Sequence, residues 1–135
     1  MTSRPIDRRE ALGALAAALT TLGGCGGGPP IPKDALVVSL ERVPAGSVVP
    51  IRWREEPLLV LNLGGTIRAL SGTCTHEGCP LGWNPRQQLI RCPCHGSAFF
   101  PDGTVKSGPA QRPLRQYPAE VRKGKLIVFE GGTTS

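Results

Sequence analysis

The chain has 135 residues, enough for one domain, and we expect no second one. Its 16 Lys and Arg residues outnumber its 10 Asp and Glu residues, for a net charge of +6, and aromatic residues make up only 4%. Because the basic residues are scattered and no aromatic residues interleave with them, the composition gives little support to nucleic-acid binding. A weakly basic surface fits an acidic partner or anionic lipid.

Residues 1–24 have the pattern of an export signal. A twin arginine, Arg8 and Arg9, precedes an apolar run over 11–22 that is too short to span a bilayer, which needs about 20 residues. The run ends at Leu-Gly-Gly-Cys, which resembles a bacterial lipobox with cleavage before Cys25 and lipid on its sulfur. We therefore expect export by the twin-arginine route and a lipid anchor on the periplasmic side of a bacterial membrane. The alternative is an uncleaved signal anchor.

Residues 25–34 have the composition of a linker, with flexible glycines followed by stiff prolines. From residue 35 to 135, short β-branched or apolar runs alternate with Gly, Pro and Asp turns, and no helical period appears. The pattern predicts an all-β domain of small antiparallel sheets. The expected strands are 35–40, 48–52, 57–63, 66–70, 89–91, 97–100, 104–106, 120–122 and 125–129. The expected hairpin turns are 62–65, 101–103 and 123–124.

Two loops of this domain hold both histidines and four of the five cysteines. The first offers Cys74 and His76, and the second offers Cys92 and His95. Zinc accepts two thiolates and two imidazoles, but zinc loops usually pair one cysteine with another and one histidine with another. One thiolate and one imidazole from each loop suit a two-iron cluster, with thiolates on one iron and imidazoles on the other. A zinc site stays open as the alternative.

The two loops resemble the signature of Rieske [2Fe–2S] proteins, and the resemblance extends over about 35–129. It implies a Rieske-type β-sandwich with one [2Fe–2S] cluster per chain, held by Cys74, His76, Cys92 and His95. It also implies a disulfide between Cys79 and Cys94, as in members of the cytochrome bc type. Such a bridge closes a loop of about 15 residues, which is worth about 3 kcal/mol in the chain-entropy model. It requires an oxidising compartment.

Four further positions bear on a bound cluster. By the resemblance, the Ser97 hydroxyl donates to a cluster sulfur and raises the potential. The segment 108–110, with Pro109 at its centre, resembles a proline loop that covers the cluster, although an ordinary Gly-Pro turn would look the same. Phe99 stands where high-potential members have a tyrosine, so one hydrogen bond is absent. Glu77 stands where bc-type members commonly have a leucine at the tip that docks into a quinol pocket. A carboxylate there argues against quinol oxidation.

The function that follows is one-electron transfer with no bond chemistry in the chain itself. Three settings fit: a standalone periplasmic carrier, the small subunit of an oxidoreductase such as arsenite oxidase, or the Rieske subunit of a bc-type quinol oxidase complex. The expected partner is a cytochrome or an oxidoreductase large subunit. We expect no oxygenase component, because the chain has no room for a mononuclear-iron domain. A zinc-stapled binding module is the alternative from another class.

Overall fold

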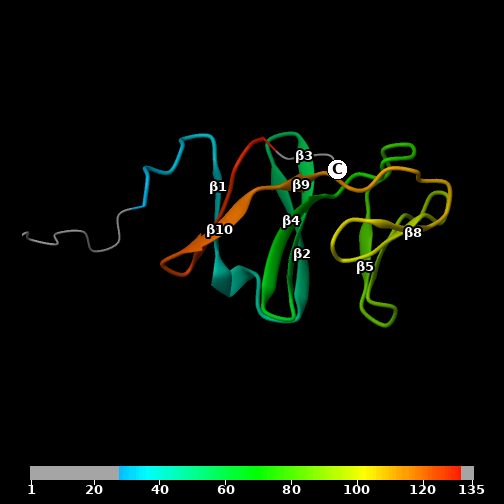
Figure 1. The fold of residues 1–135 in the computed structure, drawn as a ribbon, viewed down its shortest axis with the longest axis horizontal. Coiled ribbons are helices and arrows are strands. Elements are labelled where there is room, and N and C mark those ends of the chain that lie inside the picture. Colours follow the sequence, from blue (N-terminus) through cyan, green and yellow to red (C-terminus); the bar gives the residue numbers. More distant parts are fainter. Residues whose placement is uncertain (1–27, 132–135) are drawn as a thin grey trace, which may run out of the picture. The chain divides into compact units, whose positions relative to one another are not determined.

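The structure, a computed structural model, describes residues 28–131 (Figure 1). The chain divides after Pro30, and all the strands belong to the unit that begins at Ile31. Arg8, Arg9 and Cys25 lie outside the described residues, as does the whole of the expected export signal, residues 1–24. Within residues 28–131, no helix has the length and apolar character needed to cross a membrane.

The described residues form three antiparallel sheets and one short 3-10 helix, Leu40–Arg42. The first sheet has the order β1-β11-β10, the second β2-β3-β4-β9, and the third β5-β6-β7-β8 (Figure 1). The strands are β1 Leu36–Ser39, β2 Ser47–Trp53, β3 Glu56–Leu63, β4 Thr66–Ser71, β5 Gly82–Asn84, β6 Leu89–Arg91, β7 Ala98–Phe99, β8 Val105–Ser107, β9 Gln116–Tyr117, β10 Ala119–Arg122 and β11 Lys125–Val128. The expected all-β antiparallel fold is confirmed.

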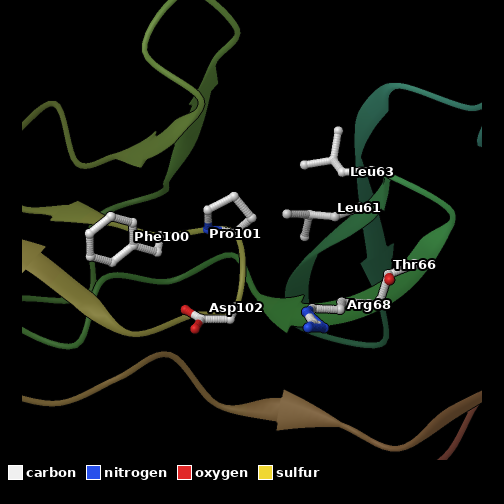
Figure 2. Close-up of a pocket in the computed structure, with 7 residues that line it drawn as sticks. All are labelled: Leu61, Leu63, Thr66, Arg68, Phe100, Pro101 and Asp102. Carbon is white, nitrogen blue, oxygen red and sulfur yellow. The ribbon is translucent and has the colours of Figure 1, made fainter.

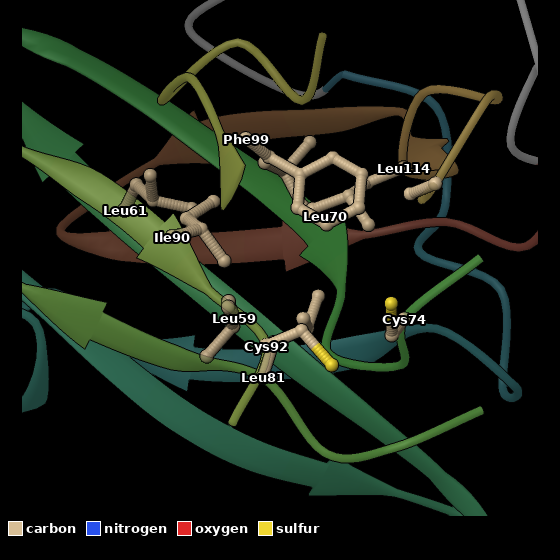
Figure 3. Close-up of a cluster of buried hydrophobic side chains, with 10 residues drawn as sticks. Leu59, Leu61, Leu70, Cys74, Leu81, Ile90, Cys92, Phe99 and Leu114 are labelled. Atoms are coloured by element: carbon tan, nitrogen blue, oxygen red, sulfur yellow. The ribbon is translucent and has the colours of Figure 1, made fainter. Parts of the chain in front are cut away.

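Strand β3 contributes to both hydrophobic cores. Successive side chains of a strand point to opposite faces of its sheet. Leu58 and Val60 pack in one core with Leu126 of the first sheet, whereas Leu59 and Leu61 pack in the other core with residues of the third sheet. Figure 3 shows this second core. Residues 58–61 are apolar at every position because both faces of this part of the strand are buried.

Two of the expected hairpin turns owe their shape to a left-handed backbone. Gly64 and Gly65 have φ of 58° and 79° between β3 and β4, and Lys123 and Gly124 have φ of 47° and 72° between β10 and β11. Two-residue hairpin turns of this kind favour positive φ at both central positions. The third expected turn, 101–103, connects β7 and β8.

Strands β5 and β9 were not expected from the sequence. Strand β5 reads Gly-Trp-Asn and lacks a β-branched run; its pairing with β6 sets Trp83 opposite Ile90. Strand β9 is two residues long and pairs only with β4. Both strands form because they pair with a neighbouring strand, and the residues of one strand alone do not predict that pairing.

Candidate metal centre

The first cysteine–histidine loop connects β4 to β5 and is closed by its own backbone. The Cys74 N–H donates to the carbonyl of Cys79 at 2.8 Å, and the Gly78 N–H donates back to the carbonyl of Cys74 at 2.9 Å. Gly78 has a φ of 74°, which a residue with a side chain rarely adopts. The closed turn therefore presents His76 and Glu77 at its tip.

The second loop connects β6 to β7 and repeats the same bonding pattern. The Cys92 N–H donates to the carbonyl of Ser97 at 2.8 Å, and the Gly96 N–H donates to the carbonyl of Cys92 at 3.2 Å. Gly96 has a φ of 79°. Each loop thus begins at a cysteine, turns at a left-handed glycine four residues later and carries a histidine between them. The two loops are equivalent in backbone as well as in ligand content.

A disulfide joins the two loops. Cys79 is bonded to Cys94, as the resemblance implied, and Cys74 and Cys92 are the free cysteines among the described residues. The bridge holds the loops together through the chain itself, whether or not a metal is bound.

The two free thiols are buried. Cys74 is 3% exposed and Cys92 is 4% exposed, and both belong to the hydrophobic core that contains Phe99. Figure 3 shows the Cys92 sulfur directed toward the side of this core on which Cys74 lies. The thiols therefore share an apolar, water-poor environment.

The two histidines lie together on the exposed side. The rings of His76 and His95 are 5.2 Å apart between centroids and nearly perpendicular, at 89°. The carboxylate of Glu77 lies 3.3 Å from Nδ1 of His95. The possible ligand atoms of these three residues lie within 4.8 Å of one another, as do the sulfurs of Cys79, Cys92 and Cys94. Cys74 belongs to neither group, although it lies in the same buried core as Cys92.

The side chain of Ser97 is buried, and its hydroxyl group has not yet used its capacity to donate a hydrogen bond. It is 0% exposed, and its Oγ accepts the Ala110 N–H at 3.1 Å. That bond uses the oxygen as acceptor, and the bonds recorded within 28–131 give the hydroxyl proton no acceptor of its own. A buried donor without an acceptor suits a site where a sulfur atom of a bound cluster, beside Cys92, would accept the hydrogen bond. Phe99 is also 0% exposed and has no polar atom to offer.

The segment 108–112 is bonded to both loops. Gly108 and Ala110 contact Ser97 of the second loop, while the Thr75 hydroxyl of the first loop donates to the Arg112 carbonyl at 2.8 Å. Pro109 itself is exposed, so its neighbours make the contacts with Ser97. Sequence reasoning missed Thr75 and Arg112, because their bond joins residues 37 positions apart.

A pocket of about 330 Å³ between β3, β4 and the turn after β7 contains none of the expected site residues (Figure 2). Asp102 at its rim accepts hydrogen bonds from the Thr104 hydroxyl and backbone N–H. Both bonds hold the pKa of Asp102 below its ordinary value of 3.8, and the bond from the Thr104 hydroxyl has the larger effect. These bonds stabilise the turn, and the pocket takes no part in the metal centre.

The donor set fits an iron–sulfur cluster of mixed ligation. Two thiols lie on the buried side and two imidazoles on the exposed side, and the buried hydroxyl of Ser97 can donate a hydrogen bond. Separation of the ligands by type suits two metal ions with different ligands. A single tetrahedral zinc ion would need all four donor atoms around one point.

Comparison with known proteins agrees with this geometry. The model of the Rieske [2Fe-2S] domain family matches residues 34–118. The cytochrome b6-f complex iron-sulfur subunit of Chlorobaculum tepidum is 36% identical over 105 residues, which cover 74% of this chain and 58% of that protein. The corresponding subunit of Chlorobaculum thiosulfatiphilum is 35% identical, over 70% of this chain and 53% of that protein. The chain thus spans somewhat more than half of these curated relatives.

Two of the similar solved structures are more than 30% identical to this chain in sequence. The plasma membrane Rieske protein of the cyanobacterium Synechocystis superposes with a TM-score of 0.60 at 31% identity, covering 67% of this chain and 94% of that one. A chain of a hyperthermophilic respiratory Complex III superposes with a TM-score of 0.59 at 32% identity, covering 67% and 72% of the two chains.

Proposed function

Because the chain belongs to the Rieske [2Fe–2S] domain family, whose domain holds a [2Fe–2S] cluster, we propose that it transfers single electrons through that cluster. The observation that carries the proposal is the sorting of the ligands: buried thiols and a paired set of exposed imidazoles. When bound, the cluster supplies a one-electron redox couple. Cys74 and Cys92 would hold one iron, and His76 and His95 the other.

The chain's own residues tune and shield this site. The apolar core around the thiols keeps water from the sulfur side, while the exposed imidazoles offer the short path to a partner. Ser97 would donate a hydrogen bond from its hydroxyl group to a cluster sulfur, and the contacts of Gly108 and Ala110 fix that hydroxyl in place. Hydrogen bonds of this kind favour the more negative reduced state.

A redox titration of the purified holoprotein tests the function. Stepwise reduction followed by visible absorption should bleach the chromophore with one electron per chain, and reoxidation should restore it. A colourless protein that takes up no electron and contains stoichiometric zinc would instead support the zinc-stapled module.

We propose as its setting a membrane-tethered periplasmic carrier, with a cytochrome or an oxidoreductase large subunit as its redox partner. Two observations on the chain support it: the exposed Glu77 at the loop tip, and the Cys79–Cys94 bridge, which an oxidising compartment favours. The names of the relatives, cytochrome b6-f and Complex III, favour a second candidate, a subunit of a larger complex. Blue-native electrophoresis of mildly solubilised membranes distinguishes the two. A carrier runs at the mass of the chain or a small oligomer, and a subunit runs with its complex.

The anchor and the export route rest on the sequence pattern. Replacing Cys25 with Ser should release the protein from membranes, and replacing Arg8 and Arg9 with Lys should keep it in the cytoplasm. A Cys25→Ser protein that stays with the membrane as before would overturn the lipid anchor. Normal export of the double-lysine variant would overturn the twin-arginine route.

A further inference from the structure

A groove of about 450 Å³ runs beside the first cysteine–histidine loop. The residues that line it include Thr73, Cys74 and Thr75 of that loop, together with Arg112 and Arg115. Because Cys74 forms part of the wall, a group seated in the groove lies next to a proposed cluster ligand. None of the residues assigned to the metal centre other than Cys74 lines it.

The groove carries net positive charge. Among the residues that line it are two arginines, Arg112 and Arg115, and one acidic residue, Glu56. The ion pairs found within residues 28–131 leave both arginines without a carboxylate partner. An arginine fork matches the two oxygens of a carboxylate, so the groove is suited to an acidic group.

The backbone at both arginines is fixed by hydrogen bonds before any ligand arrives. The Ser71 N–H at the end of β4 donates to the Arg115 carbonyl at 2.8 Å, and the Arg115 guanidinium lies 4.7 Å from the centre of the Tyr117 ring. The Thr75 hydroxyl holds the Arg112 carbonyl to the loop. The backbone of both arginines is thus held in place, and the guanidinium of Arg115 is also positioned; a preorganised donor loses less entropy on binding than a free side chain.

The tip of the same loop has the opposite charge. Glu77 lies two residues beyond Thr75, and its side chain is 55% exposed. Glu77 would repel an acidic group that a partner placed at the tip, whereas the arginines of the groove would attract the same group. Charges of opposite sign around one loop therefore select the orientation of the partner.

We propose that this groove receives a carboxylate side chain of an acidic redox partner protein and so docks that partner on the Cys74 flank of the metal centre. This inference rests on the proposed function and adds the chemistry of the partner. The arginines bind and orient, and electrons leave or enter through the site already described.

The test uses reduced holoprotein, ferricyanide as an anionic oxidant and hexaglutamate as a stand-in for an acidic protein segment. Each reduced cluster gives one electron to ferricyanide, which becomes ferrocyanide, and stopped-flow absorption gives the rate. The groove variant is Arg112→Gln/Arg115→Gln. The control variant is Arg86→Gln/Lys125→Gln, which removes the same charge from exposed positions outside the groove. Glu56→Gln removes the one negative charge of the groove.

At low ionic strength the groove variant should be oxidised about fivefold more slowly than the control variant, because steering depends on where the charge lies. Glu56→Gln should be oxidised faster than the wild type, a gain that a folding defect cannot produce. Hexaglutamate should inhibit the oxidation of the wild-type and control proteins but leave the groove variant nearly unaffected.

Equal slowing in the groove and control variants would contradict the proposed docking site. Equal inhibition of the wild type, the control variant and the groove variant by hexaglutamate would also contradict it. The EPR signal of each protein is recorded first. A wild-type protein without a Rieske signal contradicts the proposed function, whereas intact signals with unchanged rates contradict only the docking site.

Discussion

Gly108 lies with its backbone directly against Ser97. A Cβ atom at position 108 would stand 2.6 Å from the Ser97 Cα and 3.1 Å from its hydroxyl oxygen, and Gly108 also has a φ of 94°. Real Cβ atoms do not approach so closely. The contact lets Ala110 reach the Ser97 oxygen, so the hydroxyl that faces the metal centre depends on a residue without a side chain.

Replacing Gly108 with Ala should therefore destabilise the protein strongly. Gly46 provides a matched control, because it has a φ of 81° and open space around the added Cβ. We expect Gly46→Ala to lower the free energy of unfolding by about 1 kcal/mol through backbone strain alone. Gly108→Ala should cost at least about 2 kcal/mol more, because overpacking adds to the strain. Urea denaturation measures both, and equal losses would show that the segment moves aside freely.

The potential of the cluster should follow the hydrogen bonds around it. Ser97→Ala should lower the potential, and Phe99→Tyr should raise it, because a hydroxyl that donates to a sulfur favours the reduced state. We expect the wild-type potential in the upper part of the Rieske span of about −150 to +300 mV, below its ceiling. Protein-film voltammetry measures all three proteins. Potentials that do not move in either variant would place these side chains out of reach of the cluster.

The disulfide should stabilise the fold independently of the cluster. It joins residues 15 apart in sequence. The double variant Cys79→Ser/Cys94→Ser should lose up to about 3 kcal/mol of folding free energy, chiefly because its unfolded chain is less constrained. Denaturation of cluster-free protein, before and after treatment with a thiol reductant, provides the measurement. Reductant should destabilise the wild type and leave the double variant unchanged; a wild type insensitive to complete reduction contradicts the account.

Tyr117 should titrate at an unusually high pH. Burial raises the pKa of its hydroxyl above the ordinary 10.0, and the charge of Arg115, whose guanidinium lies over the ring, opposes that rise. The contribution of neutral Tyr117 to stability is fully present below the pKa that this tyrosine has in the unfolded chain. It is lost as the pH rises through the higher pKa that Tyr117 has in the folded protein. Since Tyr117 is the only tyrosine, tyrosinate absorption reports it alone.

The matched variants here are Arg115→Gln and Arg86→Gln. The first should raise the pKa of Tyr117 further, and the second, an exposed arginine in the β5–β6 turn, should leave it unchanged. A native midpoint at or below that of the urea-unfolded chain would contradict the buried position of the ring.

The sequence predicted those features that depend on neighbouring residues. The apolar run 57–63, the Gly64 and Gly65 turn and the two cysteine–histidine loops all carry local patterns, and the structure contains each of them. The contact of Gly108 with Ser97 and the bond of Thr75 to Arg112 join distant residues, so no local pattern predicts them. The same holds for β9 and for the basic groove, whose walls are Cys74 and two arginines far along the chain.

The pairing of Cys79 with Cys94 came from the family resemblance, since spacing alone leaves other pairings open. The structure then supplied the sorting of thiols to the core and imidazoles to the surface. Spacing could not supply it, because each loop offers one cysteine ligand and one histidine ligand.

Iron and sulfide analysis combined with EPR on the reduced protein tests the central claim most directly. We expect two irons and two sulfides per chain and a signal with the low average g value of mixed cysteine and histidine ligation. His76→Cys should change that signal toward all-thiolate ligation or abolish it, whereas Arg86→Gln should leave it unaltered. Carefully prepared protein with one zinc per chain, no sulfide and no EPR signal would contradict the account.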